Sequence, residues 1–344
     1  MEGTKFIYKD FTYELKNSNF NVIPPEGIET PSSVFKYYSN NKNSLDALVN
    51  QYLFCSHPYQ LNDSIDSTSL LWDFSNLSKG IFEKFYYQYG FNKAYEVNYE
   101  KEKSEGFETI RHLFFNMVSK GAGIVSLTTE PLQTLMWAHY SSEYGFMVEL
   151  DWKIVKDNIR TLNDNLKNYA FFPINYVERL ESIDFFHNDF KGPDLPYLYS
   201  VGIKRDDWSY ENEWRLMSFA MNYGIPDSIL GPYPNIDGSS ERKIYYPKEA
   251  IKSITLGKRF FNGYNLEEVI NEVTYKIKAS ENPEVLTDID FINLLHKDFN
   301  DRIYFCGEFE NDRIFKRSAE KIHFEKIDER TFKIIREDEG FYQR

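Results

Sequence analysis

Two glutamates stand two residues apart in the segment WSYENEWRL, residues 208–216, and an arginine follows at the same spacing. On a β-strand the side chains alternate between faces, so Glu211, Glu213 and Arg215 would share one face. Carboxylates held close together change each other's affinity for protons, and such pairs recur in active sites. A solvent-facing ladder in which Arg215 pairs with one glutamate is the other interpretation, and the segment alone favours it.

The composition is that of a folded protein rich in aromatic rings. The 344 residues include 29 Phe and 26 Tyr, enough to fill a large core. A net charge of -13 argues against broad binding to nucleic acid, which needs a basic surface. Two distant cysteines, Cys55 and Cys306, support neither a disulfide framework nor a multi-cysteine zinc site. The start lacks a secretory signal pattern and no segment is apolar over a bilayer's thickness, so we expect a soluble cytoplasmic protein without membrane contact.

Strand and helix patterns are mixed without regular alternation, which favours an α+β fold with mixed or antiparallel sheets and packed helices. No glycine-rich loop of the dinucleotide or Walker type occurs in the sequence, which excludes the common nucleotide-binding folds. We divide the chain into an N-terminal arm at 1–31, a main α+β domain at 32–280 and an attached C-terminal subdomain at 281–344. Strands are expected at 34–39, 122–130, 145–152, 208–219 and 251–260. Helices are expected at 43–54, over most of 69–120, at 129–145 and at 265–278.

Two of these predictions specify how an element packs. The strand at 145–152 alternates cleanly, so we expect one face to be buried and the other exposed. The helix at 265–278 has the strongest pattern, because Asn265 and Glu268 resemble a capping box and an apolar stripe follows. The stripe consists of Leu266, Val269, Ile270, Val273 and Ile277.

Four stretches, in this order, resemble the bacterial domain-of-unknown-function family 2971. MWAHY followed by GF, together with YENEWR, is a fairly specific combination. One departure is Ser64, which stands where the family pattern has Pro after Asp63. The resemblance spans about residues 34–260 and implies no activity by itself. The stretches are FKYYS (35–39), LFCSHPYQLNDSID (53–66), LMWAHYSSEYGFMVELD (135–151), and KRDDWSYENEWRL (204–216) with IKSITLGKRF (251–260) behind it.

Five residues in these stretches are candidates for substrate contact or for a structural role. They are Asn62, Asp63, Trp137, His139 and Tyr140. Asn and Asp side chains commonly bond their own backbone in loops, so turn capping is the favoured role of the first two. His139 falls on the apolar stripe of its expected helix, where a hydrogen-bonded core histidine is more common than a ligand or base.

The order of three short motifs also resembles that of the ADP-ribosyltransferases. They are Lys-Tyr-Tyr at 36–38, Ser-x-Thr at 126–128 and Glu-x-Glu at 211–213. In that superfamily a first-strand Arg or His, a Ser-Thr-Ser strand and a Glu-x-Glu strand surround the nicotinamide end of NAD. Position 36 is Lys instead, and SLTT only approximates the second motif. The resemblance implies an ADP-ribosyltransferase-like fold and NAD as co-substrate, with no metal, an unknown acceptor, and a setting as a toxin or defence effector.

The chemistry of that reaction gives the acidic residues distinct roles. Cleaving the bond between nicotinamide and ribose creates an oxocarbenium-like sugar, which a fixed carboxylate stabilises. Glu213 would have this role, and Glu211 could orient or deprotonate the incoming nucleophile. Arg215 could neutralise the diphosphate or hold one glutamate in place, and we favour the second because the reach is shorter.

The other cofactor-binding candidates come from the first two motifs. Lys36 is a candidate diphosphate contact, and Tyr37 or Tyr38 could stack on nicotinamide, although at least one of them is expected in the core. Ser126 and Thr128 would contact ribose in this interpretation. Hydroxyl side chains on a strand face without any ligand are, however, more common.

Two other classes of function remain open. A metal-dependent hydrolase could use His57, Asp66, His139 or the Asn-Asp loop, but the spacing matches no tight metal signature. A non-catalytic interaction module could use the many Tyr and Trp side chains to contact a protein partner. A transferase requires Glu213 in a cleft, a hydrolase requires an ion near His57 or His139, and a module requires neither.

Overall fold

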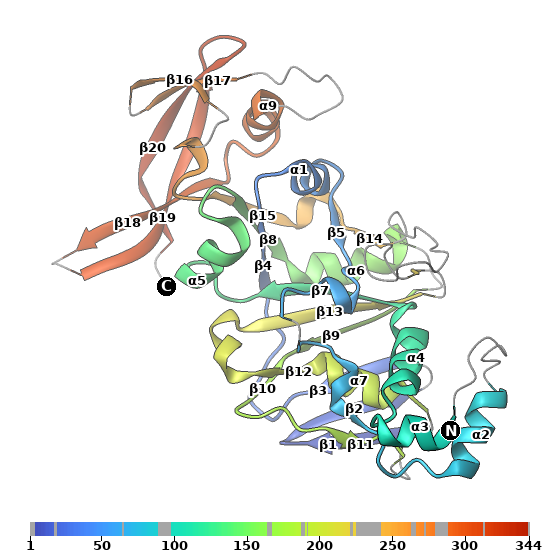
Figure 1. Ribbon diagram of the computed structural model, residues 1–344. Coiled ribbons are helices and arrows are strands. Elements are labelled where there is room, and N and C mark those ends of the chain that lie inside the picture. Colours follow the sequence, from blue (N-terminus) through green and yellow to red (C-terminus); the bar gives the residue numbers. More distant parts are fainter. Residues whose placement is uncertain are drawn as a thin grey trace.

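The computed structural model describes residues 4–16, 19–63, 65–88, 98–163, 167–186, 190, 192–220, 223–224, 242–262, 266–271, 273–278, 288–311 and 314–342. These residues form helices around one large mixed sheet, which confirms the α+β fold predicted from the sequence. Figure 1 shows a small N-terminal sheet at one end of the molecule and the C-terminal strands at the other. None of the described helices is long and apolar enough to span a membrane.

The large sheet has eleven strands in the described part of the chain. Its only parallel neighbours are β15 and β18, and the other pairs are antiparallel. In spatial order the strands are β16 (Leu266–Asn271), β17 (Thr274–Ile277), β20 (Thr331–Tyr342), β19 (Ile314–Lys326), β18 (Ile303–Asn311), β15 (Ile251–Leu256), β8 (Phe146–Asp151), β4 (Ser33–Tyr38), β7 (Ala122–Thr128), β13 (Glu213–Phe219) and β9 (Asn168–Pro173).

Helices cover both faces of this sheet, because alternate strand residues feed two hydrophobic cores. Val125 and Leu127 of β7 join the core that contains α6 and α9, whereas Ile124 joins the core that contains α4 and α7. The helices are α1 (Lys42–Val49), α2 (Lys79–Gln88), α3 (Tyr99–Ser104), α4 (Glu108–Ser119), α5 (Thr134–Met136), α6 (Trp152–Leu162), α7 (Asp194–Gly202) and α9 (Asp288–Asp298). Helices therefore occur within the predicted ranges 43–54 and 69–120, although the first range is helical only to Val49 and ends in strand β5 (Tyr52–Phe54).

Four smaller sheets complete the described structure. The N-terminal sheet is an antiparallel meander of β1 (Thr4–Tyr8), β2 (Phe11–Lys16) and β3 (Asn19–Ile23). Its Tyr13 is fully buried beside Tyr199 of α7, so it packs on the second core. The domain boundaries at 31 and 280 stay predictions. The two-stranded pairs are β5 (Tyr52–Phe54) with β14 (Lys243–Tyr245), β10 (Asn175–Val177) with β12 (Ile203–Arg205), and β6 (Trp72–Asp73) with β11 (Ile183–Asp184).

The helix predicted at 265–278 is wrong. The segment forms the hairpin of β16 and β17, and β17 pairs with β20. Val269 and Ile270, assigned to the apolar stripe, are 54% and 50% exposed, and Asn265 lies outside the described residues. Val, Ile, Thr and Tyr favour strands, and their branched or aromatic side chains pack well on a pleated sheet next to a partner strand.

Two predictions around residue 140 also fail in part. Only α5 is α-helical in 129–145, and it continues in a wide π-type turn at Trp137–Ser141. The Pro131 carbonyl accepts hydrogen bonds from the side chains of Tyr37 and Trp137. These bonds hold the chain before α5 in a non-helical conformation. The strand β8 is buried on both faces instead of one, because Met147 packs with Trp137 in a third cluster on the face opposite the main core.

The large sheet is split along one edge of β7. Alternate residues of a strand present their backbone groups to the same neighbour, and Ile124, Ser126 and Thr128 face this edge. Thr128 pairs with Phe35 of β4, and Ile124 forms a bridge with Ser56 beyond β5. Between them the Ser126 carbonyl accepts a hydrogen bond from the Lys36 ammonium at 3.0 Å. A lysine side chain therefore fills the position of a missing strand partner.

Gly145, at the start of β8, permits the close approach of β4. A Cβ atom there would lie 1.9 Å from the Tyr38 carbonyl oxygen, whereas a Cβ at Gly80 of α2 meets nothing within 4 Å. We expect Gly145→Ala to lower the free energy of unfolding by about 1–3 kcal/mol, because the backbone must shift. Gly80→Ala is the control and should leave it unchanged or raise it. Urea unfolding measures both, and equal midpoints for the two variants would contradict the packing.

Candidate functional site

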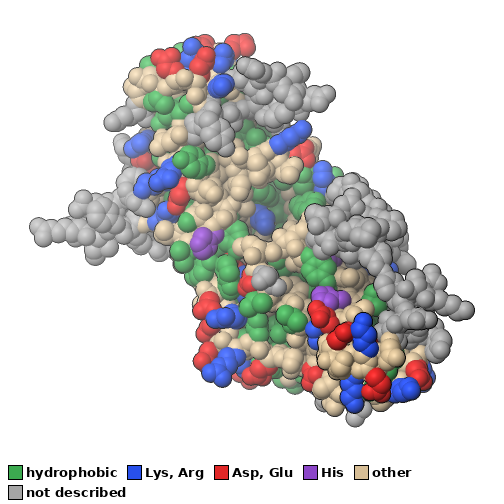
Figure 2. Space-filling view, viewed as in Figure 1, with side chains coloured by type: hydrophobic (Ala, Val, Ile, Leu, Met, Phe, Trp, Pro, Cys, Tyr) green, Lys and Arg blue, Asp and Glu red, His purple; other side chains and the backbone are tan. Residues whose placement is uncertain are grey.

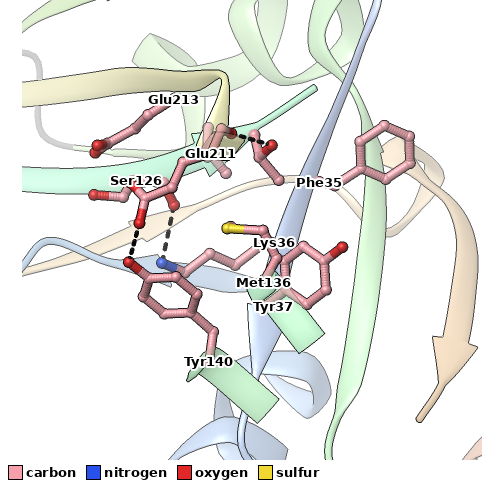
Figure 3. Close-up of a pocket in the computed structure, with 10 residues that line it drawn as sticks. Phe35, Lys36, Tyr37, Ser126, Met136, Tyr140, Glu211 and Glu213 are labelled. Atoms are coloured by element: carbon pink, nitrogen blue, oxygen red, sulfur yellow. Dashed lines mark hydrogen bonds between the residues drawn. The ribbon is translucent and has the colours of Figure 1, made fainter. Parts of the chain in front are cut away.

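The three sequence motifs meet in one small pocket of about 40 Å³ (Figure 3). Lys36 and Tyr37 come from β4, Ser126 from β7 and Tyr140 from the turn after α5, while Glu211 and Glu213 complete the lining beside Ser126. The convergence on which a catalytic interpretation depends is therefore present. The lining residues are Phe35, Lys36, Tyr37, Ser126, Leu127, Thr128, Met136, Tyr140, Glu211 and Glu213.

Glu211 and Glu213 are neighbours in space, but they do not lie on one strand as predicted. The strand expected at 208–219 begins only at Glu213, and Asp206–Glu211 form a 3₁₀ helix. Asn212 between them has φ 40° and ψ 50°, a left-handed conformation in which Asn is favoured. Both carboxylates still reach one cation, since the Lys204 ammonium lies 2.6 Å from Glu211 and 3.3 Å from Glu213.

The environment moves the pKa values of the two carboxyl groups in opposite directions. Burial opposes ionisation of Glu213, but the charges of Arg215 and Lys204 outweigh it and lower its pKa to about 2. Burial and the neighbouring Glu213 charge raise the pKa of Glu211, although Lys204 and Tyr140 act against the rise. Two carboxylates whose pKa values are pushed apart fit different roles in one reaction.

Arg215 holds Glu213 from inside the protein. Its side chain is fully buried, and its Nε donates to Glu213 at 2.8 Å. The rest of the guanidinium bonds both carboxylate oxygens of Asp66 at 2.9 and 2.5 Å and the Val201 carbonyl at 2.7 Å. Arg215 is therefore occupied by protein partners and does not line the pocket, in keeping with the holding role favoured from the sequence.

Lys36 lies across the pocket from the glutamates, whereas Ser126 lies beside Glu213. Lys36 is half-buried, and in the part of the chain that the structure describes no carboxylate lies within ion-pair distance of its ammonium. Burial lowers its pKa, while Glu213 and Glu211 act in the other direction. A hydrogen bond from Ser126 also helps to keep Glu213 ionised.

Three other cofactor-binding candidates have structural contacts. The Thr128 hydroxyl donates to the Glu211 carbonyl at 2.5 Å and so fixes the chain that carries the glutamate. The Tyr37 hydroxyl donates to the carbonyls of Glu130 and Pro131, and its ring packs edge-on against the buried Trp137. Tyr38 stacks on Phe146 in the main core with ring centroids 5.2 Å apart.

The Asn-Asp loop reaches the pocket through Tyr140. The Tyr140 hydroxyl donates to Glu211, and Asn62 donates to that hydroxyl oxygen at 3.1 Å. Asp63 accepts from the Ile65 amide at 3.0 Å, the turn capping favoured from the sequence. His139 is exposed with Nδ1 3.1 Å from the Tyr210 hydroxyl, so the core position expected for it is wrong. The wide turn at 137–141 directs Tyr140 inward instead.

The residues of the proposed metal site do not assemble. Asp66 is committed to Arg215, and His57 is fully buried with its Nδ1 accepting from the Tyr59 amide. Among the described residues no group of three His, Cys, Asp or Glu side chains is placed to hold a metal ion. The geometry gives no support to the hydrolase interpretation.

Lys204 is the site residue that sequence reasoning missed. It is 4% exposed, bonds both glutamates and lies 4.6 Å from the Trp208 ring centroid. Its place in the charged run KRDD is typical of a surface segment, and only the pairing of β12 with β10 turns it inward. The spacing of seven residues to Glu211 carries no known signature.

Comparison with known families finds one match, and it covers the acidic half of the pocket. Residues 136–216 match DUF2971, a protein family of unknown function. The matched segment contains Tyr140, Lys204, Glu211, Glu213 and Arg215, whereas Lys36 and Ser126 precede it. The match lies inside the 34–260 span of the resemblance. No curated protein and no solved structure matches the chain.

The first prediction for the carboxylate pocket concerns Arg215. Arg215→Met leaves Asp66 and Glu213 as buried charges without their main partner, so we expect the free energy of unfolding to fall by about 3–5 kcal/mol. Arg205→Met is the control, because Arg205 pairs with Asp207 on the exposed surface and such pairs contribute little. Equilibrium unfolding in urea compares them, and similar midpoints would contradict the buried network.

The second prediction concerns pH. The folded-state pKa of Glu213 is about 2, below the ordinary 4.5, so its ionised form stabilises the protein above pH 4.5 and this contribution is lost as the pH falls toward 2. The pKa of Glu211 is raised above the ordinary 4.5 in the folded protein. As the pH falls through this raised pKa toward 4.5, the folded protein takes up a proton before the unfolded chain does, so its stability increases.

Gln variants separate these opposite slopes. As the pH falls from 7 toward 4.5, wild type should gain stability relative to Glu211→Gln. Below pH 4.5, it should lose stability relative to Glu213→Gln. Unfolding free energies measured across this range test both signs, and slopes of the same sign would refute the assignment.

Proposed function

We propose that this protein is an ADP-ribosyltransferase-like enzyme that cleaves the bond between nicotinamide and ribose in NAD and transfers the ADP-ribosyl group to an acceptor. The observation that carries the proposal is the glutamate pair in one pocket, with the pKa of Glu213 held low and that of Glu211 raised. The biological setting as a toxin or defence effector has no residue behind it and stays a prediction.

The two carboxylates divide the reaction between them. Glu213 stays ionised over the physiological range and stabilises the positive charge that develops on the ribose. The carbon–nitrogen bond breaks with its electron pair leaving on nicotinamide, which becomes neutral. The nucleophile forms a new bond to the anomeric carbon with its own lone pair, and its proton passes to Glu211, whose raised pKa suits a general base.

The arrangement of the motifs supports this reaction over an unrelated carboxylate site. The strands β4, β7 and β13 are neighbours in the large sheet, and each gives motif residues to the pocket, among them Lys36, Ser126 and Glu213. This order follows the three-part motif order of the ADP-ribosyltransferases. The resemblance in sequence and the adjacency in space are independent observations.

The size of the pocket limits how NAD can bind. A volume of about 40 Å³ is far below the roughly 300–1,000 Å³ of small-molecule sites. Only the reacting end of NAD can approach the glutamates, and side chains at the rim, Lys36 and Tyr140, must move to admit it. A second cavity of about 570 Å³ also has Lys36 in its wall and provides space of ligand size beside the pocket.

Nicotinamide release from NAD tests the proposal directly. We expect purified protein to consume NAD, and Glu213→Gln to lower the rate by about 10²–10³, because it removes the charge that stabilises the transition state. Glu325→Gln, at an exposed position on β19, is the control and should keep the wild-type rate.

Folding of each variant is checked by circular dichroism. An unchanged rate in folded Glu213→Gln contradicts the role of that residue. Absence of NAD consumption together with absence of NAD binding in calorimetry contradicts the proposal and favours the non-catalytic interaction module, in which neither glutamate needs a ligand.

A further inference from the structure

The cavity of about 570 Å³ is built by elements that the proposed reaction does not use. It lies between α1, β4, β5 and β14, and it shares only Lys36 with the carboxylate pocket. Figure 2 shows a hollow near the middle of this face of the molecule, with Lys or Arg atoms at its floor and hydrophobic atoms around it. The lining residues are Lys36, Tyr38, Asn43, Ser44, Asp46, Ala47, Tyr52, Phe54, Ser56 and Lys243.

The split in the sheet creates this cavity. β4 leaves β7 after one residue pair, and β5 with its continuation approaches β7 again at Ile124. In this gap the Lys36 side chain extends from β4 to β7 and donates a hydrogen bond to the Ser126 carbonyl. Lys36 therefore lines both the larger cavity and the pocket that holds the glutamates.

Two cations give the cavity its chemistry. Lys36 has no carboxylate within ion-pair distance among the described residues, which is unusual for a half-buried ammonium and leaves room for an anionic partner. The Lys243 ammonium lies 3.4 Å from Asp46 and 4.3 Å from the Tyr52 ring centroid. Asn43 and Ser44 lie in the first turn of α1, so the positive end of this helix faces the cavity. That turn contains no acidic residue. Phosphate groups fit this combination.

Aromatic and acidic groups complete the wall. Tyr52, Phe54 and Ser56 follow alternate positions of β5 and its continuation, so they share one face. Phe54 is 37% exposed and has no ring contact within the described chain, so its face is open for stacking. Asp46 accepts hydrogen bonds from Tyr52 and Asn50 at 2.7 Å and has the chemistry that binds sugar hydroxyls.

We propose that this cavity binds a nucleoside diphosphate group, with its phosphates at Lys36 and Lys243 and its base against Phe54. Its volume lies in the range of small-molecule sites and exceeds what inorganic phosphate needs. The inference rests on the proposed function only for orientation: a ligand held this way extends its far end past Lys36 toward the glutamates. Binding of the diphosphate group itself does not depend on catalysis.

Calorimetry with ADP, adenosine and inorganic phosphate tests the inference on the full chain. We expect ADP to bind more tightly than either of its parts. Lys243→Gln should weaken ADP binding at least 10-fold, and Lys243→Arg should retain it. Lys248→Gln is the control for charge, since Lys248 pairs with Asp298 outside the cavity, and it should bind ADP as wild type does. Phe54→Leu should weaken ADP binding without affecting phosphate.

The outcomes separate this inference from the proposed enzyme activity. No ADP binding, or equal affinity in Lys243→Gln and wild type, overturns the nucleotide site even when NAD is consumed. Phosphate binding as tightly as ADP also overturns it, because the cavity then recognises an anion without a nucleoside. ADP binding that depends on Lys243 and Phe54 upholds the site even when NAD turnover is absent.

Discussion

The guanidinium of Arg215 is the contact on which the rest of the site depends. It joins three segments that are far apart in sequence, through Asp66 in the loop after β5, Val201 in α7 and Glu213 on its own strand. Ionising a carboxylate in a buried place is unfavourable unless a cation is fixed beside it. Burial raises the pKa of Glu211, and the charge that Arg215 and Lys204 maintain on Glu213 raises it further. The fixed charges around Glu213 thus influence the protonation of both acids.

The parts of the site that could be predicted are those governed by local strand geometry. Lys36, Ser126 and Glu213 lie on strands whose alternation and aromatic or β-branched composition are visible in short windows of sequence. Short sequence windows do not reveal the order of these strands in the sheet. Only the remote resemblance in motif order indicated that the three strands would be neighbours. Their convergence follows from the pairing of β7 with both β4 and β13.

The parts that sequence reasoning missed depend on tertiary structure. Glu211 reaches its place through a single left-handed residue, Asn212, which no hydrophobic period reveals. Lys204 belongs to a run of charges and is buried only because β12 pairs with β10. The hairpin of β16 and β17 has apolar residues at helical spacing, yet pairing with β20 decides its structure, and Val269 and Ile270 face solvent.

The split beside β7 also has a mechanical consequence. In the described chain, the strands from β16 to β4 join those from β7 to β9 within the sheet at one residue pair, Phe35 with Thr128. Backbone hydrogen bonds between strands resist separation, so the sheet is weakest at this seam. A change in the angle between the two halves would open or close the path past Lys36 while each strand ladder stayed intact. Access to the glutamates is thus linked to the stiffness of a single strand junction.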